Sequence, residues 1–310
     1  MYDTDKIAIL LATYMGENYI EEQLQSLLNQ TYTNWIAYIH DDGSTDKTCE
    51  IIQSYAEKYA DKFVIVYGKS TGGARNNFFF LMSQVRAPYF MFCDQDDIWL
   101  PNKIETTYHE MKKIEHKEQE QTPVLVFTEL KVVDKHLNTI AEKMSDYQGL
   151  DCKDVTLNHI LAQNVVTGCT MMINSTLCDK MLQVKNKKHI IMHDWWAALI
   201  AVTYGKIVYI DESTILYRQH GENSIGASQA TSFMYKLKKF FSSKENKKAL
   251  YRGRLQAQEF ADVFKLSKKH LIYQYAVLGK KNKLKRMQFY WKHKIRKSSL
   301  AKQIGIYIWG

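Results

Sequence analysis

The sequence predicts an α/β fold in which a mostly parallel sheet is flanked by helices and followed by a basic helical region. Two observations predict this class. Over the first 130 residues, short apolar runs typical of strands alternate with longer stretches of helical period. From residue 231 on, basic residues interleave with apolar and aromatic ones. With 310 residues and 45% hydrophobic content, the chain is long enough to bury one large core or two modest ones.

The expected elements follow from these patterns in chain order. Strands are predicted at residues 7–12, 36–40, 63–67, 89–93 and 124–128, with helices between them, and further strands at 170–173 and 206–210. A helix over residues 19–28 would place Ile20, Leu24 and Leu27 on one face against the sheet. We expect Asp46 to be the N-cap of the second helix and Pro101 to lie in the first turn of another.

Charge divides the chain near residue 230. Residues 231–310 contain 21 Lys and Arg and three acids, a net charge of +18, whereas residues 1–230 have a net charge of −9. This asymmetry predicts a boundary there. The basic region suits either the anionic surface of a membrane or packing of its apolar side on the rest of the protein or on a second subunit. Binding of nucleic acid is a distant alternative, because it leaves the acidic strand ends unexplained.

The composition also limits where the protein acts. The sequence has no run of 18 apolar residues and no basic, apolar N-terminal leader, so we expect neither a spanning helix nor export. Its five scattered cysteines fit reduced thiols of a cytosolic protein.

Three polar clusters follow predicted strands, at the sheet edge where open α/β proteins bind their ligands. Asp94, Asp96 and Asp97 lie within four positions, and their mutual repulsion favours a bound cation. A hard divalent ion accepts such oxygen ligands and can bridge to phosphates. The alternative is an Asp-rich turn that solvates a strand end. The sequence contains neither a G-x-G-x-x-G run after the first strand nor a phosphate-binding P-loop.

The second cluster, DDGSTD at residues 41–46, predicts a tight turn and a capped helix, but Asp42 could also accept hydrogen bonds from a base or ribose. Tyr14, at the end of the first strand, could stack on that base.

Four further residues have two interpretations each. Asp194 is either the N-cap of a helix or a general base whose proton affinity is raised by the aromatic side chains around it. Arg218 and His220 could meet a diphosphate or a metal, or belong to an ordinary loop. Arg75 could meet phosphate or solvate a helix start.

In this order, the clusters resemble glycosyltransferase family 2, the inverting enzymes with the GT-A fold. The resemblance covers about residues 6–225 and rests on LATY (11–14), QTY (30–32), DDGSTD (41–46), FCDQDDIW (92–99), GC (168–169), HDWW (193–196) and YRQH (217–220). The DQDDIW and HDWW runs are similar to those of rhamnosyltransferases in bacterial capsule and cell-wall polysaccharide assembly.

The resemblance implies a role for each matching residue. Asp194 would be the catalytic base, and a Mg²⁺ or Mn²⁺ ion would bind at Asp96, Asp94 and His220, with Asp96 as the more dependable ligand. Nucleotide contacts are expected at Thr13, Tyr14, Glu17, Asp42, Arg75, Asp94 and Gln95, and contacts to the donor or acceptor sugar at Trp99, Gly168, His193, Trp195 and Arg218.

The implied domain order is a catalytic GT-A domain over residues 1–230, followed by the basic amphipathic helical region over 231–310. Within the catalytic domain, the nucleotide-sugar half would span about 1–130 and the acceptor half about 131–230. The basic region would contact a membrane surface or a second subunit of a homo-oligomer.

The implied reaction moves a sugar, rhamnose in the first instance, with inversion from a nucleoside-diphosphate donor to a hydroxyl of a lipid-linked glycan in capsule, cell-wall or exopolysaccharide synthesis. A UDP-hexose or UDP-N-acetylhexosamine donor is the alternative. Such an enzyme is expected in the cytoplasm, peripheral on the inner face of the cell membrane.

Overall fold

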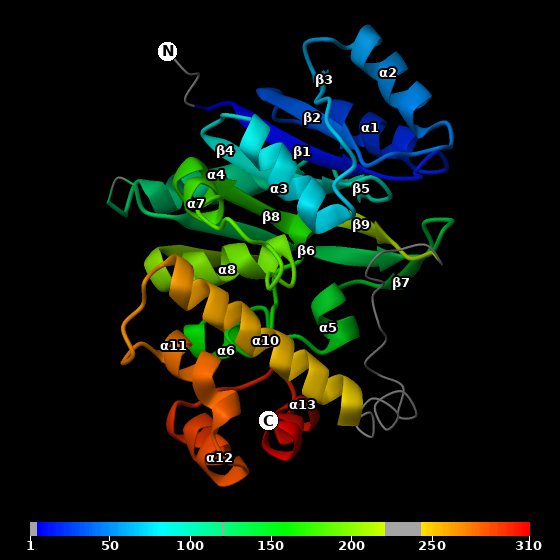
Figure 1. Cartoon of the computed structure of the whole chain (residues 1–310). Helices are drawn as coiled ribbons and strands as arrows, with labels where there is room; N and C mark the ends of the chain where they lie inside the picture. Colours follow the sequence, from blue (N-terminus) through cyan, green and yellow to red (C-terminus); the bar gives the residue numbers. More distant parts are fainter. Residues whose placement is uncertain (1–4, 120, 221–242) are drawn as a thin grey trace.

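The computed structural model describes residues 5–119, 121–220 and 243–310. A nine-stranded mixed sheet lies at its centre, with the strand order β3-β2-β1-β4-β8-β6-β9-β5 and with β7 paired to β6. Figure 1 shows this sheet seen with the C-terminal helices below it. The predicted α/β class, with flanking helices and a helical C-terminal region, is confirmed.

The first half of the sheet is parallel. Its strands are β1 (Ile7–Thr13), β2 (Trp35–Asp41), β3 (Phe63–Ile65) and β4 (Tyr89–Asp94). Thr13 is paired with Asp41, and Ala12 with Asp94, so β1, β2 and β4 end side by side. The acidic residues that follow these strands therefore meet at one edge of the sheet.

The second half reverses direction. β8 (Met171–Asn174) runs antiparallel to both β4 and β6 (Val124–Val133), and β6 is parallel to β9 (Lys206–Arg218). The short strands β5 (Ile98–Trp99) and β7 (Thr139–Ala141) complete the sheet. Because β8 opposes β4, the turn η1 (Gly168–Thr170), which precedes β8, reaches the edge where β4 ends.

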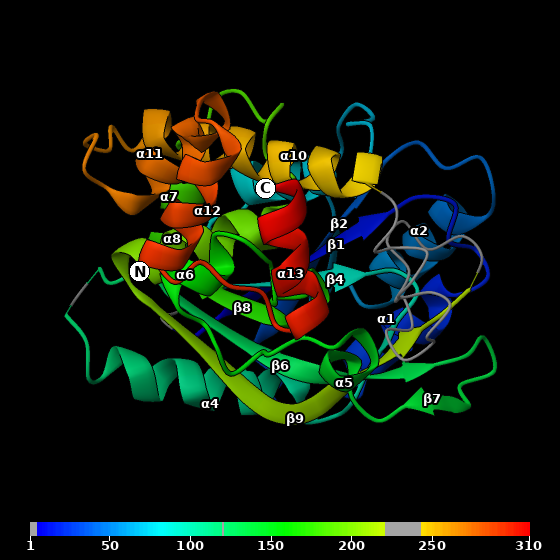
Figure 2. The same ribbon diagram turned by 90° about the horizontal axis from the view of Figure 1, so that it is seen from below.

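Helices cover both faces of the sheet, and the alternation of side chains along the strands accounts for this arrangement. Ile7, Ile9 and Leu11 of β1 enter one hydrophobic cluster, and Ala8 and Leu10 enter the other. The first cluster includes α1 (Ile20–Leu28), α2 (Thr48–Lys58) and α4 (Lys103–Glu115), and the second includes α3 (Ala74–Gln84), α7 (Ser175–Met181) and α8 (His193–Tyr204). Figure 2 shows α4 and α8 on opposite sides of the sheet.

The C-terminal helices pack outside α8. They are α10 (Ser243–Val263), α11 (Leu271–Ala276), η2 (Val277–Lys280), α12 (Lys283–Lys292) and α13 (Leu300–Trp309). Of the small helices, α5 (Met144–Gln148) contacts β6, and α6 (Leu157–Ile160) contacts α8. The ring centroid of Phe260 on α10 lies 5.3 Å from that of Trp196 on α8. This part of the basic region therefore shares the core of the sheet domain. The boundary near residue 230 lies outside the described residues.

Several predicted boundaries differ from the structure. β6 and β9 run past residues 128 and 210, because a bulge lets the polar segment around Glu129 and Ser213 stay paired. Asp46 is not the N-cap of α2, although its Oδ1 accepts from the backbone N–H of Thr48 at 3.1 Å. Pro101 precedes the Asn102 N-cap of α4 instead of lying in its first turn.

No helix in the described ranges combines the length and the apolar content needed to cross a bilayer.

Candidate functional site

The ends of β1 and β4 are tied together by a side-chain amide. Gln95 accepts a hydrogen bond from Tyr14 N at 2.8 Å and donates one to Tyr14 O at 2.7 Å. Gly16 permits this approach, since a Cβ there would lie 2.4 Å from Gln95 Oε1. The ring of Tyr14 is 59% exposed and thus free of the core, as a stacking surface for a base requires.

Two other predicted nucleotide contacts brace the same edge. Thr13 Oγ1 donates to Asp41 Oδ2 at 2.9 Å. Glu17 donates its backbone N–H to Asp46 and accepts the backbone N–H of Lys47 on its own carboxylate at 2.9 Å. The structure therefore brings Thr13, Tyr14, Glu17 and Gln95 together at the end of β1, and their contact with a nucleotide stays a prediction.

Asp42 holds the loop that precedes α3. Its carboxylate accepts backbone N–H groups of Thr71 and Gly72 on one oxygen and of Gly73 on the other, the last at 2.6 Å. Gly72 and Gly73 have φ of 79° and 116°, which favours glycine. Burial raises the pKa of Asp42, but these hydrogen bonds outweigh it, and the net pKa is below the ordinary value. Asp42 is an ionised anchor of this loop.

Arg75, in the first turn of α3, reaches across to the segment before α8. Its Nη1 donates to Ile190 O at 2.5 Å, and its Nε donates to Asn76 Oδ1 at 3.2 Å. The guanidinium thus connects the loop held by Asp42 to the strand-like segment that leads into Asp194. A phosphate contact at Arg75 stays a prediction.

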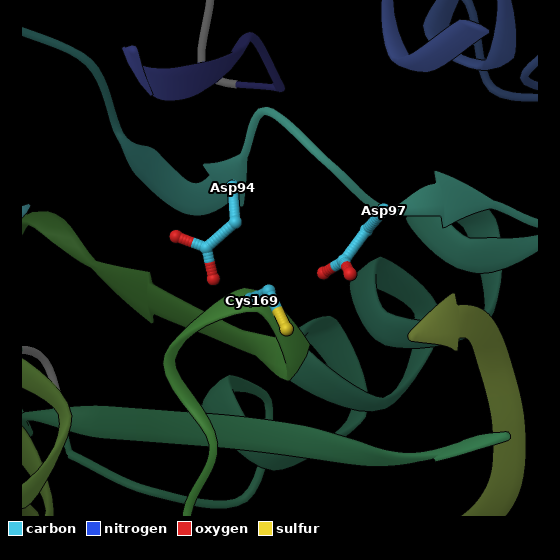
Figure 3. A group of neighbouring side chains, drawn as sticks. All are labelled: Asp94, Asp97 and Cys169. Atoms are coloured by element: carbon cyan, nitrogen blue, oxygen red, sulfur yellow. The ribbon is translucent and has the colours of Figure 1, made fainter. Parts of the chain in front are cut away.

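The acidic turn after β4 (Asp94, Asp96 and Asp97) has two carboxylates near the surface, Asp94 and Asp96, and one in the interior, Asp97. One carboxylate oxygen each of Asp94 and Asp97 and the Sγ of Cys169 lie within 4.8 Å of one another (Figure 3). Burial, and then the charge of Asp96, raise the pKa of Asp94 to about 7. Burial, and then the charges of Asp96 and Asp94, raise the pKa of Asp97 well above its usual value. Three carboxyl groups are therefore crowded here, and their mutual repulsion disfavours the ionised form of Asp94 and Asp97.

The carboxylate oxygens on the accessible side of this cluster are ligands of the kind that a hard cation prefers. Asp94 and Asp96 are partly accessible, whereas Asp97 and Cys169 are buried. Burial raises the pKa of the Cys169 thiol well above its ordinary value, and a thiol suits Mg²⁺ or Mn²⁺ poorly. The two carboxylates that the structure groups are those of Asp94 and Asp97, and a metal ion held by Asp94 and Asp96 stays a prediction. His220 lies beside it, with its Nε2 2.9 Å from Asp96 Oδ2, and its ring stacks on Tyr19.

Beneath this cluster lies a buried lysine that sequence reasoning did not single out. Lys103, on α4, is fully buried and donates to Thr170 O at 3.3 Å. Burial lowers the pKa of Lys103 to about 8, although the nearby Cys169, Cys93 and Asp97 oppose this shift. The lysine supplies an internal positive charge below the acidic turn.

Arg218 holds the acidic turn in place. The sequence predicts a sugar contact for this residue, but its side chain is buried. The side chain is 4% exposed. Its Nε donates to Asp96 O at 3.1 Å and its Nη1 to Lys135 O at 3.0 Å, while Nη2 forms an ion pair with Glu22 of α1. The guanidinium thereby fixes the backbone that carries the Asp96 carboxylate.

Trp99, predicted as a sugar contact, lies in the core. It is 1% exposed and belongs to the hydrophobic cluster under α1 and α4. Its backbone N–H donates to Ser26 Oγ at 3.1 Å, and Lys103 Nζ lies 4.8 Å from its ring centroid. This burial does not support the predicted sugar contact.

Asp194 lies in the first turn of α8 and is 9% exposed. The N-cap is Met192, so the capping interpretation of Asp194 is wrong. Asp194 Oδ1 accepts from Asn164 Nδ2 at 3.0 Å and from Trp195 N at 2.5 Å. Burial raises the pKa of Asp194 to about 7 against these hydrogen bonds and one from the backbone of Gly168. A carboxyl group with such a pKa can both take and hold a proton near neutrality.

The acidic turn and Asp194 lie close enough for their charges to interact. The charge of Asp194 contributes to the raised pKa of Asp94, after burial and Asp96. Gly168, predicted as a sugar contact, lies beside His193 and Asp194: a Cβ on it would approach His193 Nε2 to 2.7 Å and Asp194 Oδ2 to 3.8 Å. Glycine at this position therefore permits the close approach of η1 to the His193 side chain, and a sugar contact here stays a prediction.

The two neighbours of Asp194 are less accessible than predicted. His193 is 2% exposed and lies between the rings of Phe78 and Phe92, and both of its ring nitrogens lack a partner among the described residues. Burial lowers the pKa of His193 to about 3, so it is neutral. This burial does not support the predicted sugar contact at His193. Trp195 is half-buried, and its Nε1 donates to Ile160 O at 2.7 Å.

Sequence reasoning missed Glu22, Asn164 and Lys103. Glu22 and Lys103 lie on helices whose periodicity marks them only as surface or core positions, and Asn164 lies in an irregular segment. Their contacts span 30 to 196 positions of sequence. No local pattern could have indicated them.

Comparison with known proteins agrees with this geometry. The family model described as glycosyl transferase family 2 matches residues 8–118. The dTDP-rhamnosyl transferase RfbG of Shigella flexneri is 32% identical over 238 residues, which are 73% of this chain and 77% of that protein. The UDP-Glc:alpha-D-GlcNAc-diphosphoundecaprenol beta-1,3-glucosyltransferase WfgD of Escherichia coli is 31% identical over 107 residues, 34% of this chain and 41% of that one.

A solved structure shares the fold. The crystal structure of S. aureus TarS 1–349 in complex with UDP-GlcNAc has a TM-score of 0.56, with 15% identity, over 97% of this chain and 89% of that chain. Similarity at this identity concerns the fold alone.

Proposed function

Since the chain belongs to glycosyltransferase family 2, we propose that it transfers a sugar from a nucleoside-diphosphate donor to a hydroxyl of a growing polysaccharide, by a single displacement with inversion. The observation that carries the proposal is the buried Asp194, whose pKa is raised to about 7, opposite the acidic turn that contains Asp94 and Asp96.

In this mechanism Asp194 removes the proton of the acceptor hydroxyl as that oxygen attacks the anomeric carbon. Asn164 holds Oδ1 through its 3.0 Å hydrogen bond and leaves the other oxygen toward the space beside Gly168. The proton passes to that carboxylate, and the bond from the anomeric carbon to the diphosphate breaks. The buried surroundings of Asp194 keep water away from the base and raise its proton affinity.

The donor half of the site would be the edge formed by β1, β2 and β4. Tyr14 would stack on the base, and the loop held by Asp42 would lie along the nucleotide. Asp94 and Asp96, with His220, would hold Mg²⁺ or Mn²⁺, which supplies positive charge for the departing diphosphate. Arg218 would fix the turn that presents these ligands, through its hydrogen bond to Asp96 O.

For the donor sugar we propose rhamnose from a dTDP donor, which is supported by the similarity to RfbG over most of both chains. A UDP-hexose or UDP-N-acetylhexosamine is the second candidate, supported by WfgD and by the fold shared with TarS. By the same similarity to WfgD, we propose a lipid-linked glycan as acceptor. With such an acceptor, we also propose a peripheral position at the inner face of the cell membrane.

A thermal-shift panel of sugar nucleotides, with and without Mn²⁺, tests the donor proposal. One donor and its free nucleoside diphosphate should raise the melting temperature only when metal is present. The same panel on Asp96→Ala should show no metal-dependent rise. A chain that responds to no nucleotide, or an Asp96→Ala variant that responds as the wild type does, would contradict the proposal.

A further inference from the structure

Two helices at the C-terminal end present apolar stripes that no other described part of the chain covers. We call them the α12–α13 face, which comprises Leu284, Met287 and Trp291 of α12 and Leu300, Ile304 and Ile308 of α13. Trp291 and Leu300 are each 78% exposed, and Leu284 is 65% exposed. Side chains of this size and exposure on adjacent turns form a patch and not isolated surface residues.

Helical geometry places each stripe on the side opposite the buried side. With 3.6 residues per turn, the three apolar residues of α12 lie within about 60° of its circumference, and those of α13 within about 80°. The inward sides carry Phe289 of α12, which packs against the core, and the buried Ile306 of α13. The chain therefore uses one apolar side of each helix to attach it to the protein and leaves a second one outward.

The fold holds both helices in place. Arg254 on α10 donates from Nη2 to the hydroxyl of the buried Tyr290 at 2.7 Å. Asn282 is the N-cap of α12, and Ser299 is the N-cap of α13. Figures 1 and 2 agree that α12 and α13 lie side by side at the end of the molecule remote from α2.

Positive charge flanks the α12 stripe. Residues 263–310 contain 13 Lys and Arg and no Asp or Glu. Lys283 and Lys292 flank the α12 stripe on its two sides, and both are exposed, as is Lys294 beyond the helix. Arg296, by contrast, is held by Asp154 and belongs to the internal packing. An apolar centre with a rim of lysines matches the layering of an anionic lipid surface, with acyl chains below the headgroups.

We propose that the α12–α13 face docks the protein on an anionic lipid bilayer, with Trp291, Leu284 and Leu300 entering the interface and the lysines meeting the headgroups. This inference rests on the proposed function in one respect. The proposed lipid-linked acceptor lies in the membrane, and this face would hold the enzyme at that surface.

The charge distribution favours lipid over two other occupants. In a dimer formed through this face, the lysines of the two copies would lie close together and repel each other. Residues 263–310 contain no Asp or Glu that could pair with them. A nucleic acid would require cations or ring faces at the centre of the surface, whereas aliphatic side chains occupy five of the six positions there.

Flotation of the full chain with vesicles tests the proposal. Vesicles of phosphatidylcholine with phosphatidylglycerol should carry the protein upward, and those of phosphatidylcholine alone should carry much less. Trp291→Ser should weaken the partition by roughly tenfold, and Lys283→Gln and Lys292→Gln by about fivefold each at low salt. Tyr67→Ser, which removes an aromatic ring that is 81% exposed elsewhere, is the matched control and should bind as the wild type does.

Further measurements keep this test separate from the donor proposal. The variants should retain the metal-dependent thermal shift with a sugar nucleotide, because the α12–α13 face lies outside the site. Equal flotation of wild type and Trp291→Ser would overturn the proposal. The proposal would also be overturned if light scattering showed that the wild type is a dimer and Trp291→Ser a monomer. A third contradicting result would be that RNA abolishes flotation and binds the wild type but not Trp291→Ser.

Discussion

Replacing Asp194 by Asn should make the protein more stable and much less active. A carboxyl whose pKa is raised from 3.8 to about 7 carries a penalty of about 4 kcal/mol on its ionised form. The unfolded chain ionises this residue near pH 4, whereas the folded chain keeps it protonated up to about pH 7. The wild type therefore loses that stability as the pH rises from about 4 to 7.

The Asn variant has no proton to lose, so its free energy of unfolding should exceed that of the wild type by an amount that grows with pH. We expect a small difference at pH 4 and about 4 kcal/mol above pH 7. The oxygen of the introduced amide can still accept from Asn164, so the contacts of the site persist. Urea unfolding at these pH values, with EDTA present, measures the difference.

Activity should move the other way. Loss of the general base should lower kcat by roughly a hundredfold to ten-thousandfold. The kcat/KM of the wild type should fall below about pH 7, where Asp194 becomes protonated in the free enzyme.

Asp179→Asn, which removes an exposed carboxylate of α7, is the matched control and should change neither quantity. A stability difference between Asp194→Asn and wild type that is the same at all pH values would refute the raised pKa. An Asn variant with a large share of wild-type activity would refute the role as base.

Three other changes test the remaining site and the fold. Asp96→Asn should abolish the thermal shift by Mn²⁺ with a nucleoside diphosphate, and a shift equal to the wild type's would show that this carboxylate is not a ligand. Glu22→Gln removes the acidic partner of Arg218. It should weaken Mn²⁺ binding by roughly tenfold in a calorimetric titration, and unchanged affinity would mean that Arg218 does not position the metal ligands. Gly205→Ala would place a Cβ 1.8 Å from Pro123 O and should destabilise the protein by about 1–3 kcal/mol in urea, and a neutral effect would count against the close approach of β9 to β6.

The sequence patterns predict the parallel half of the sheet well, because β1 and β4 are apolar on both faces and because β2 and β4 end in acids. They predict less of the second half. There Glu129 and Lys131 interrupt the apolar run of β6, and only the pairing with β9 through a bulge keeps them in a strand.

For the site, local motifs locate the residues but do not orient them. Asp194 and the acidic turn meet as expected, yet Trp99 and His193 turn into the core, and Arg218 is used to hold the turn. A motif looks the same in the sequence whether the aromatic or basic residue next to a functional acid contacts the ligand or packs in the core and holds the acid in place. Contacts over 100 or more positions, such as Arg218 to Glu22, decide between these roles.

The reversal of direction at β8 separates two sets of loops. Segments that follow β1, β2 and β4 reach the site from one half of the chain, and the segment that precedes β8, with Gly168, reaches it from the other. The strands of the two sets meet in three residue pairs between β4 and β8, and few side chains cross between their loops, such as Arg75 to Ile190 O and Arg218 to Asp96 O. A change of loop length in one set that spares these contacts should therefore leave the other set in place.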